Sequence, residues 1–349
     1  MDYYAGKRVL VTGHTGFKGS WLSFILSQIG AEVFGLSLSD PVDSKHSFFA
    51  LGVNEVVKNP ESAYGDICKI NINKLLSDVK PHYIFHLAAQ AIVSESYFRP
   101  VETILTNSMG SIYLADAIRT SDLKVTSLFI TSDKCYKNLE QESAYIETDE
   151  LGGNDPYSSS KASAEILLNS YFKSFPSMLD NGIATARAGN VFGGGDWSQN
   201  RLIPDCARQI YDGNPISIRM PHATRPWSYV LDILEGYLLL ASKLSDEPIK
   251  YHGSYNFASG ETHSVEDVVE AFLKITGAGA VHVEAGASFG HESKLLQIDA
   301  TKSRLKLGWS PKLSVHDSLK ESAKWYLAQS EETDMRNFSK DILVNRKIL

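Results

Sequence analysis

A glycine-rich turn near the start of the chain restricts the fold more than any other feature. The apolar run at residues 8–11 is typical of a buried parallel strand, and it leads directly into residues 13–19, which read GHTGFKG. Residues 20–26 have the apolar spacing of a helix packed on a sheet, Gly30 favours the end of that helix, and residues 32–36 form a second strand-like run. Strand, glycine turn, helix and strand make a βαβ unit.

The spacing of the three glycines in this turn predicts a dinucleotide site. Gly13 would permit the tight turn, Gly16 would let the backbone approach a pyrophosphate, and Gly19 would allow close helix–strand packing. The phosphates would then meet the free N–H groups at the start of the helix. Spaced glycines also occur in ordinary strand–helix turns, and it is their place at the first βα junction that favours the dinucleotide.

Strand and helix patterns continue to alternate as far as Arg187. We predict strands around residues 56–57 and within 83–90, 127–130 and 183–187, and long helices at 100–119 and 157–172. Small residues at the end of the run at 83–90 would let a cofactor lie flat against the backbone, whereas His86 is expected to be a packed strand histidine. The alternation predicts an α/β fold with a Rossmann-type doubly wound parallel sheet, followed by a smaller mixed α/β lobe.

The bulk composition excludes several classes of protein. The 349 residues suffice for two lobes with substantial cores, and the net charge of -7 argues against broad nucleic-acid binding. The three cysteines are far apart and form no C-x-x-C pair, so we expect neither disulfides nor a metal site. No basic segment precedes an apolar one at the start, and no apolar run approaches the ~20 residues that span a bilayer. We therefore expect a cytoplasmic protein that does not bind membranes.

Two polar clusters are candidates for the chemistry. Thr131-Ser132-Asp133-Lys134 follows an apolar strand directly, and the carboxyl end of a strand is where ligands bind in an open α/β sheet. The second cluster begins at Pro156, which favours a helix start and places Tyr157 and Lys161 on one helical face. A tyrosine pKa of about 10 makes a poor base at neutral pH, but an adjacent ammonium and a positive nicotinamide would favour the phenolate. Ser132 would hold the substrate hydroxyl.

The residues after residue 36 bear on which dinucleotide binds. A carboxylate at the end of the second strand often holds the ribose of NAD. The local sequence is Ser37-Leu38-Ser39-Asp40, with Asp40 as the nearest carboxylate and no arginine to hold the extra phosphate of NADP. We therefore expect NAD.

The sequence after Arg187 changes in character and predicts a second binding region. A glycine-rich loop at 190–197 is followed by a helix that begins near Arg201, and then by Arg219, Arg225 and Trp227. Arginine favours bidentate phosphate contacts, so these residues could clamp a nucleotide diphosphate and its base. Scattered surface ion pairs are the alternative, which the sequence leaves open.

Taken together, the glycine turn, the Tyr157/Lys161 pair and Ser132 resemble the extended short-chain dehydrogenase/reductase family, from Val9 to about Trp325. Within that family the chain is similar to the CDP-glucose 4,6-dehydratases. The similarity rests on the Ser132-Asp133-Lys134 triplet and on four longer stretches, which are 13–21, 187–191, 193–197 and 221–227.

The resemblance implies roles for particular residues. It implies that NAD binds in the first lobe and CDP-glucose in the second. Tyr157, tuned by Lys161, would take the proton of the sugar 4-hydroxyl. Lys134 would be the base for carbon 5, and Asp133 would protonate the leaving 6-hydroxyl. Asp66 would hold the adenine, and Ser37 stands where relatives place the ribose carboxylate. The full set of implied cofactor ligands is Gly13, Gly16, Phe17, Lys18, Gly19, Asp40, Asp66, Ile67, Leu87, Ala88, Ala89, Gln90, Asn107, Tyr157 and Lys161. The implied substrate ligands are Asn190, Arg201, Arg219, Arg225, Trp227 and His291.

The resemblance also implies a division of the chain and an assembly. We expect a dinucleotide-binding domain at 1–187 and 226–257, a sugar-nucleotide lobe at 188–225 and 258–330, and a tail or packing arm at 331–349. The helices at 100–119 and 157–172 would pair with their copies in a homodimer, or in a homotetramer. Two rival functions stay open: a 4-epimerase, which has no need of Asp133 and Lys134, and a non-catalytic dinucleotide sensor.

Overall fold

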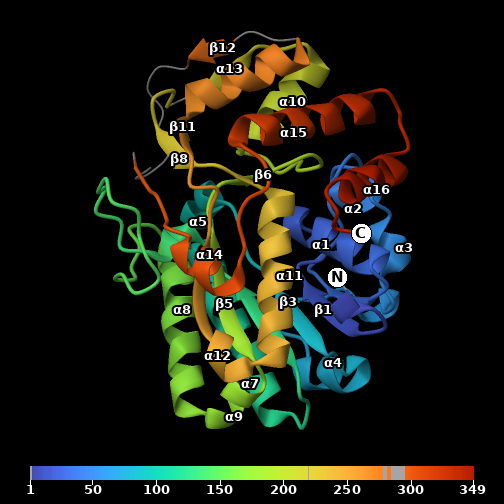
Figure 1. Cartoon of the computed structure of the whole chain (residues 1–349), viewed down its shortest axis with the longest axis vertical. Coiled ribbons are helices and arrows are strands. Elements are labelled where there is room, and N and C mark those ends of the chain that lie inside the picture. Colours follow the sequence, from blue (N-terminus) through green and yellow to red (C-terminus); the bar gives the residue numbers. More distant parts are fainter. Residues whose placement is uncertain (1, 219, 278–280, 284–294) are drawn as a thin grey trace.

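The computed structural model describes residues 2–218, 220–277, 281–283 and 295–349. Among these residues, six parallel strands form the central sheet in the order β10-β5-β4-β3-β1-β2 (Figure 1). Their bounds are β1 Arg8–Thr12, β2 Glu32–Leu36, β3 Tyr83–His86, β4 Thr126–Ile130, β5 Ile183–Ala188 and β10 Gly253–Phe257. The strand order reverses between β1 and β3, and such a switch point is where open parallel sheets bind ligands. The predicted doubly wound sheet is confirmed.

Helices cover both faces of the sheet because alternate strand residues point to opposite sides. Val9 and Val11 pack in one apolar core with α1 (Phe17–Gln28) and α11 (Val230–Asp246). Leu10 belongs to the other core, which includes side chains of α4 (Ile72–Val79), α7 (Gly110–Thr120) and α8 (Pro156–Ser174). The two cores hold the strand ends rigidly, and with them the loops that carry the polar clusters.

A smaller lobe lies beyond one end of the sheet, at the top of Figure 1. It contains α10 (Leu202–Asp212), α13 (Val265–Thr276) and α15 (Val315–Ser330). Short strand pairs connect its segments: β8 Thr224–Pro226 with β11 Thr262–Ser264, β7 Ile216–Ile218 with β12 Val281–Val283, and β6 Val191–Phe192 with β9 Ser228–Tyr229. The residue boundaries predicted for the two lobes stay a prediction.

The end of the chain packs against the body of the protein. Residues Met335–Asn345 form α16, in which the Ser339 hydroxyl accepts a 2.9 Å hydrogen bond from the Trp325 indole. Arg336 on the same helix forms a 2.7 Å ion pair with Glu55 near the N-terminus. Of the two alternatives for residues 331–349, the packing arm therefore describes them better than a tail.

Two sequence expectations need correction. The strand around residues 56–57 is wrong, because Val53–Val56 form the short helix α3 and an apolar pair alone does not distinguish the two. The long helix at 100–119 is interrupted: α6 (Pro100–Ile104) and α7 are joined by a π-helical turn, η3 (Leu105–Met109). The remaining short elements are η1 Asp2–Tyr4, α2 Ser47–Ala50, η2 Pro60–Ser62, α5 Val93–Phe98, η4 Asp133–Cys135, α9 Pro176–Asp180, α12 Pro248–Tyr251 and α14 Thr301–Leu307. Over the described part of the chain, no helix has the length and apolar character needed to cross a bilayer.

Candidate active site

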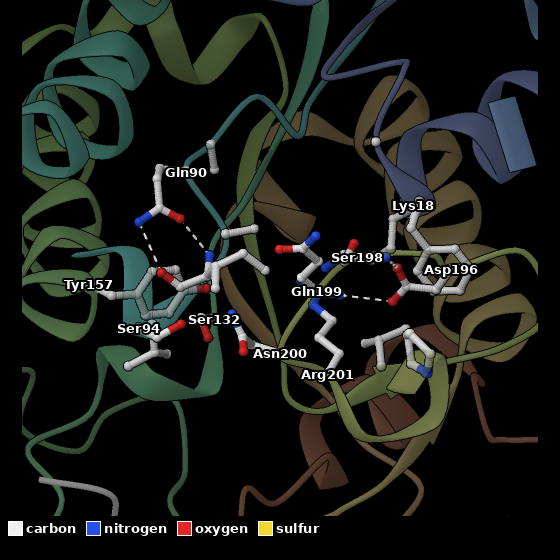
Figure 2. Close-up of a pocket in the computed structure, with 18 of the residues that line it drawn as sticks. Lys18, Gln90, Ser94, Ser132, Tyr157, Asp196, Ser198, Gln199, Asn200 and Arg201 are labelled. Atoms are coloured by element: carbon white, nitrogen blue, oxygen red, sulfur yellow. Dashed lines mark hydrogen bonds and ion pairs between the residues drawn. The ribbon is translucent and has the colours of Figure 1, made fainter. Parts of the chain in front are cut away.

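A large cavity opens at the carboxyl ends of the sheet strands, facing the smaller lobe. Its volume is about 1440 Å³, and its walls include the glycine turn, the ends of β3 and β4, the start of α8 and the loop 196–201. Figure 2 shows Tyr157 and Ser132 on one side of the cavity and Lys18 with Asp196 on the other. This volume exceeds that of an ordinary small-molecule pocket and suits a dinucleotide together with a second ligand.

The glycine turn packs so closely against its neighbours that side chains are excluded. Gly13 has a φ of +75°, and a Cβ there would lie 2.8 Å from the backbone nitrogen of Ala88. A Cβ at Gly19 would lie 2.0 Å from the carbonyl oxygen of Gly13. Gly16 is the N-cap of α1, so the first N–H groups of this helix face the cavity, where they can receive phosphate oxygens. These residues fit the pyrophosphate of a dinucleotide.

A serine, Ser37, follows β2 at the position where relatives place the carboxylate that binds the ribose of NAD. The Ser37 hydroxyl accepts a 3.2 Å hydrogen bond from the Thr15 backbone and lies 2.9 Å from Nδ1 of His14. Burial lowers the pKa of His14 to about 4, so this ring is neutral. Asp40 lies further along, exposed, and its carboxylate accepts a hydrogen bond from the Tyr64 hydroxyl. Both Ser37 and Asp40 line the cavity, and the ribose contact of Asp40 stays a prediction.

The other predicted cofactor ligands line the cavity, with one exception. Asp66, Ile67 and the segment 87–90 are on its wall. Asn107 is buried, with 1 % of its surface exposed, and is not among the described lining residues. Its amide accepts a 2.8 Å hydrogen bond from the Gln90 backbone and donates one of 2.9 Å to the Ser160 hydroxyl. The π turn η3 carries this residue, so Asn107 connects the loop after β3 to the helix that bears Tyr157.

Lys18, one of the implied cofactor ligands, lines the same cavity. Burial, together with the charges of Arg201 and Lys161, lowers the pKa of its amine to about 7, although the Asp133 carboxylate opposes this shift. Three cationic side chains therefore surround one part of the cavity. Such a cluster attracts phosphate groups.

The start of α8 presents Tyr157 and Lys161 as predicted. Pro156 stands in its first turn and the Asp155 carboxylate caps it by accepting a 2.9 Å hydrogen bond from the Ser158 backbone. Burial raises the pKa of Tyr157 to about 12, opposed by a hydrogen bond with Ser132. Burial also lowers the pKa of Lys161 to about 8. Tyr157 and Ser132 thus lie side by side, although one comes from the start of α8 and the other from the segment after β4.

Asp133 and Lys134 form the short turn η4 directly after β4. The Asp133 Oδ1 accepts a 2.9 Å hydrogen bond from the Ser132 hydroxyl, whereas Oδ2 is buried and has no hydrogen-bond partner. Lys134 is half-buried, and both residues line the cavity. A buried carboxyl oxygen without a partner is unusual, and it marks Asp133 as a residue whose role goes beyond local hydrogen bonding.

The smaller lobe contributes Asn190, Arg201, Arg225 and Trp227 to the cavity wall. Arg201 pairs with Asp196 at 3.2 Å, and Asp196 is almost fully buried. Asp196 was not among the predicted ligands, although its place in a glycine-rich loop shortly before an arginine was a usable signal. The predicted ligands Arg219 and His291 lie outside the described residues.

The sheet order, the glycine turn and the Tyr157/Lys161 pair beside Ser132 define an extended short-chain dehydrogenase/reductase. More closely, the chain belongs to the family described as GDP-mannose 4,6 dehydratase, which matches residues 10–322.

Curated relatives of the chain are also sugar-nucleotide 4,6-dehydratases. The chain is 38% identical to the CDP-glucose 4,6-dehydratase of Salmonella typhimurium over 97% of its own length and 96% of that protein. It is 27% identical to the human GDP-mannose 4,6 dehydratase, over 89% of each chain. Among solved structures, the dTDP-glucose 4,6-dehydratase of Bacillus anthracis in complex with NAD superimposes with a TM-score of 0.75 at 21% identity, covering 93% of this chain and 98% of that one. The epimerase Mth375 of Methanothermobacter thermautotrophicus has a TM-score of 0.80 at 24% identity, covering 96% and 95%, so both structures bear on the fold alone.

Proposed function

We propose that this protein is a CDP-glucose 4,6-dehydratase, which converts CDP-glucose to CDP-4-keto-6-deoxyglucose with loss of water. The observation that carries the proposal is the convergence of Tyr157, Ser132, Asp133 and Lys134 on the cavity that the glycine turn also lines. Identity of 38% with a CDP-glucose 4,6-dehydratase over nearly the whole chain supports the choice of substrate.

The cavity suits NAD as the cofactor. The first turn of α1 would hold the pyrophosphate of NAD, and the segment 87–90 would hold its nicotinamide half. Asp66 would hold the adenine. When bound, NAD would accept a hydride from carbon 4 of the sugar and return it to carbon 6, and its positive ring would favour the Tyr157 phenolate.

The residues of the chain would handle the protons. Tyr157 takes the proton of the sugar 4-hydroxyl, and Ser132 orients that hydroxyl. The ketone formed at carbon 4 acidifies the proton on carbon 5, which the Lys134 amine removes. Asp133 donates a proton to the 6-hydroxyl, which leaves as water, and carbon 5 regains a proton from Lys134. The Asp133 side chain lines the cavity, where it would face the leaving hydroxyl.

A panel of nucleotide sugars tests the proposal. The protein is incubated with NAD and CDP-, dTDP-, UDP- and GDP-glucose and with GDP-mannose, and the products are analysed by mass spectrometry. We expect loss of one water from CDP-glucose at the highest kcat/KM. An isomer of unchanged mass, separated from the substrate by chromatography, would indicate a 4-epimerase instead, and no product from any sugar would favour the dinucleotide sensor.

A homodimer is proposed on the basis of one exposed apolar surface. The helical segment α6-η3-α7 and helix α8 are in contact and expose large apolar side chains on the outside of the molecule: Val101, Ile104, Leu105, Tyr113, Ile166 and Leu167. Exposed apolar side chains on helices that contact one another are a common mark of an interaction site. Pairing of these helices with their copies would bury it.

A further inference from the structure

A buried ion pair lies directly behind the catalytic residues. Glu165 is on α8, two turns after Tyr157 and one turn after Lys161, and pairs with Arg187 of β5. The guanidinium donates hydrogen bonds of 3.0 Å and 2.8 Å to the carboxylate, and the two side chains are only 2% and 3% exposed. The mechanism above uses neither residue.

The ion pair holds the first residue of the catalytic segment. The Thr131 hydroxyl donates a 2.5 Å hydrogen bond to Oε1 of Glu165, and Thr131 directly precedes Ser132. Glu165 thereby connects the helix that carries Tyr157 to the strand end that carries the other catalytic groups.

The ion pair also holds the last residue of that segment. Arg187 donates a 2.8 Å hydrogen bond from Nη1 to the Tyr136 hydroxyl, which in turn donates one of 2.7 Å to the Asn256 side chain on β10. Tyr136 follows directly after η4, the turn that contains Asp133 and Lys134. Residues 131–136 are therefore fixed at both ends by one buried pair.

A buried ion pair is a weak source of stability, because desolvation of two charges offsets most of their attraction. Its hydrogen bonds, however, impose directions that an apolar contact would not. We propose that the Glu165–Arg187 pair is a positioning unit, which sets the placement of Ser132, Asp133 and Lys134 relative to Tyr157. This inference rests on the proposed function for its kinetic test, but its structural test does not.

A second effect of Glu165 follows from its charge. Lys161 must carry a proton to favour the Tyr157 phenolate, and burial opposes this protonation, whereas Glu165 and Cys135 favour it. The other titratable groups close enough to interact are His86 on β3 and Lys18 on α1, besides Tyr157 itself. Glu165→Gln should thus move the basic limb of the pH profile of kcat to lower pH, because Lys161 would lose its proton more easily.

The chain offers a matched pair of variants for the main test. Thr131 and Thr185 are both buried, and each donates one hydrogen bond to Glu165. Only Thr131 belongs to the catalytic segment, since Thr185 lies within β5. Thr131→Val and Thr185→Val therefore make the same chemical change to the same carboxylate.

We expect Thr131→Val to lower kcat about tenfold or more with KM within about twofold, because small displacements of catalytic groups are costly. Thr185→Val should keep kcat within about twofold of the parent, although both variants lower the unfolding temperature. Thr131→Ser, which keeps the hydroxyl, should restore kcat. Tyr136→Phe tests the other end of the segment independently and should also lower kcat, even if Thr131→Val does not fold.

Amide hydrogen exchange supplies a test that needs no turnover. Exchange of the peptide covering 131–136 should accelerate in Thr131→Val and Tyr136→Phe but not in Thr185→Val. Equal exchange and equal loss of kcat in the two valine variants, or parental kcat in both Thr131→Val and Tyr136→Phe, would overturn the positioning role. A parent protein that is inactive on every nucleotide sugar but shows the exchange difference would contradict the proposed function and leave the positioning unit in place.

Discussion

The carboxylate of Asp133 lies directly against the backbone of Gly189: a Cβ at position 189 would come within 2.0 Å of the Asp133 Oδ2. The φ of Gly189 is not positive, so backbone conformation does not require glycine there. The requirement is space for the carboxyl group. Gly189 thus decides where the proposed proton donor can sit.

Gly189→Ala should lower kcat for water loss by about tenfold or more, because the methyl group must displace Asp133. Gly152→Ala is a suitable control, since a Cβ there would meet the Lys137 Cβ at 3.2 Å, a much milder contact away from Asp133. Steady-state kinetics with CDP-glucose would compare the two variants. Equal kcat in both would mean that the position of Asp133 does not limit the reaction.

Tyr157→Phe should nearly abolish turnover while the unfolding temperature changes little. Only the phenol oxygen is removed, and the ring stays packed in a wall of the cavity. The comparison is of kcat and of the thermal unfolding curve with those of the parent. Turnover close to the parental rate would show that Tyr157 is not the base.

The oligomeric state should depend on the apolar surface of α8. Ile166 is 53% exposed on this surface, so Ile166→Arg would place a charge in the proposed dimer contact. We expect the parent to be a dimer by light scattering at micromolar concentration and this variant to be a monomer. Leu305→Arg, at an 81% exposed position on α14, should leave the dimer intact. A monomeric parent would exclude the homodimer.

Stability should fall in mild acid because of His86. Burial lowers the pKa of this ring to about 3, so it stays neutral in the folded protein, between the hydroxyls of Thr12 and Ser111. In the unfolded chain the His86 ring takes up a proton below its ordinary pKa of about 6.5. The free energy of unfolding therefore falls by up to about 1.4 kcal/mol per pH unit because of this group as the pH drops below that value. His86→Gln should reduce the slope of unfolding free energy against pH between 6 and 4. An unchanged slope in His86→Gln would exclude this group as the cause.

Much of the sheet and of the catalytic pair could be predicted from the sequence, because the features that encode them are local. Strand runs, a glycine turn and residues at helical spacing such as Tyr157 and Lys161 are visible in short windows of sequence. The role of Asn107 was not predictable, since it depends on a π turn inside an apparently regular helix. Glu165 gave no signal either, because Thr131 follows β4 and Arg187 lies in β5, and both meet this helical residue only in the fold.

Transfer of a label within the sugar tests the account most directly. CDP-glucose carrying deuterium at carbon 4 is incubated with the parent protein and NAD in ordinary water, and the product is examined by mass spectrometry and NMR. The account predicts loss of one water, with the deuterium retained at carbon 6 of a 4-keto-6-deoxy sugar. Retention of the 6-hydroxyl with inversion at carbon 4, or recovery of unchanged CDP-glucose, would contradict it.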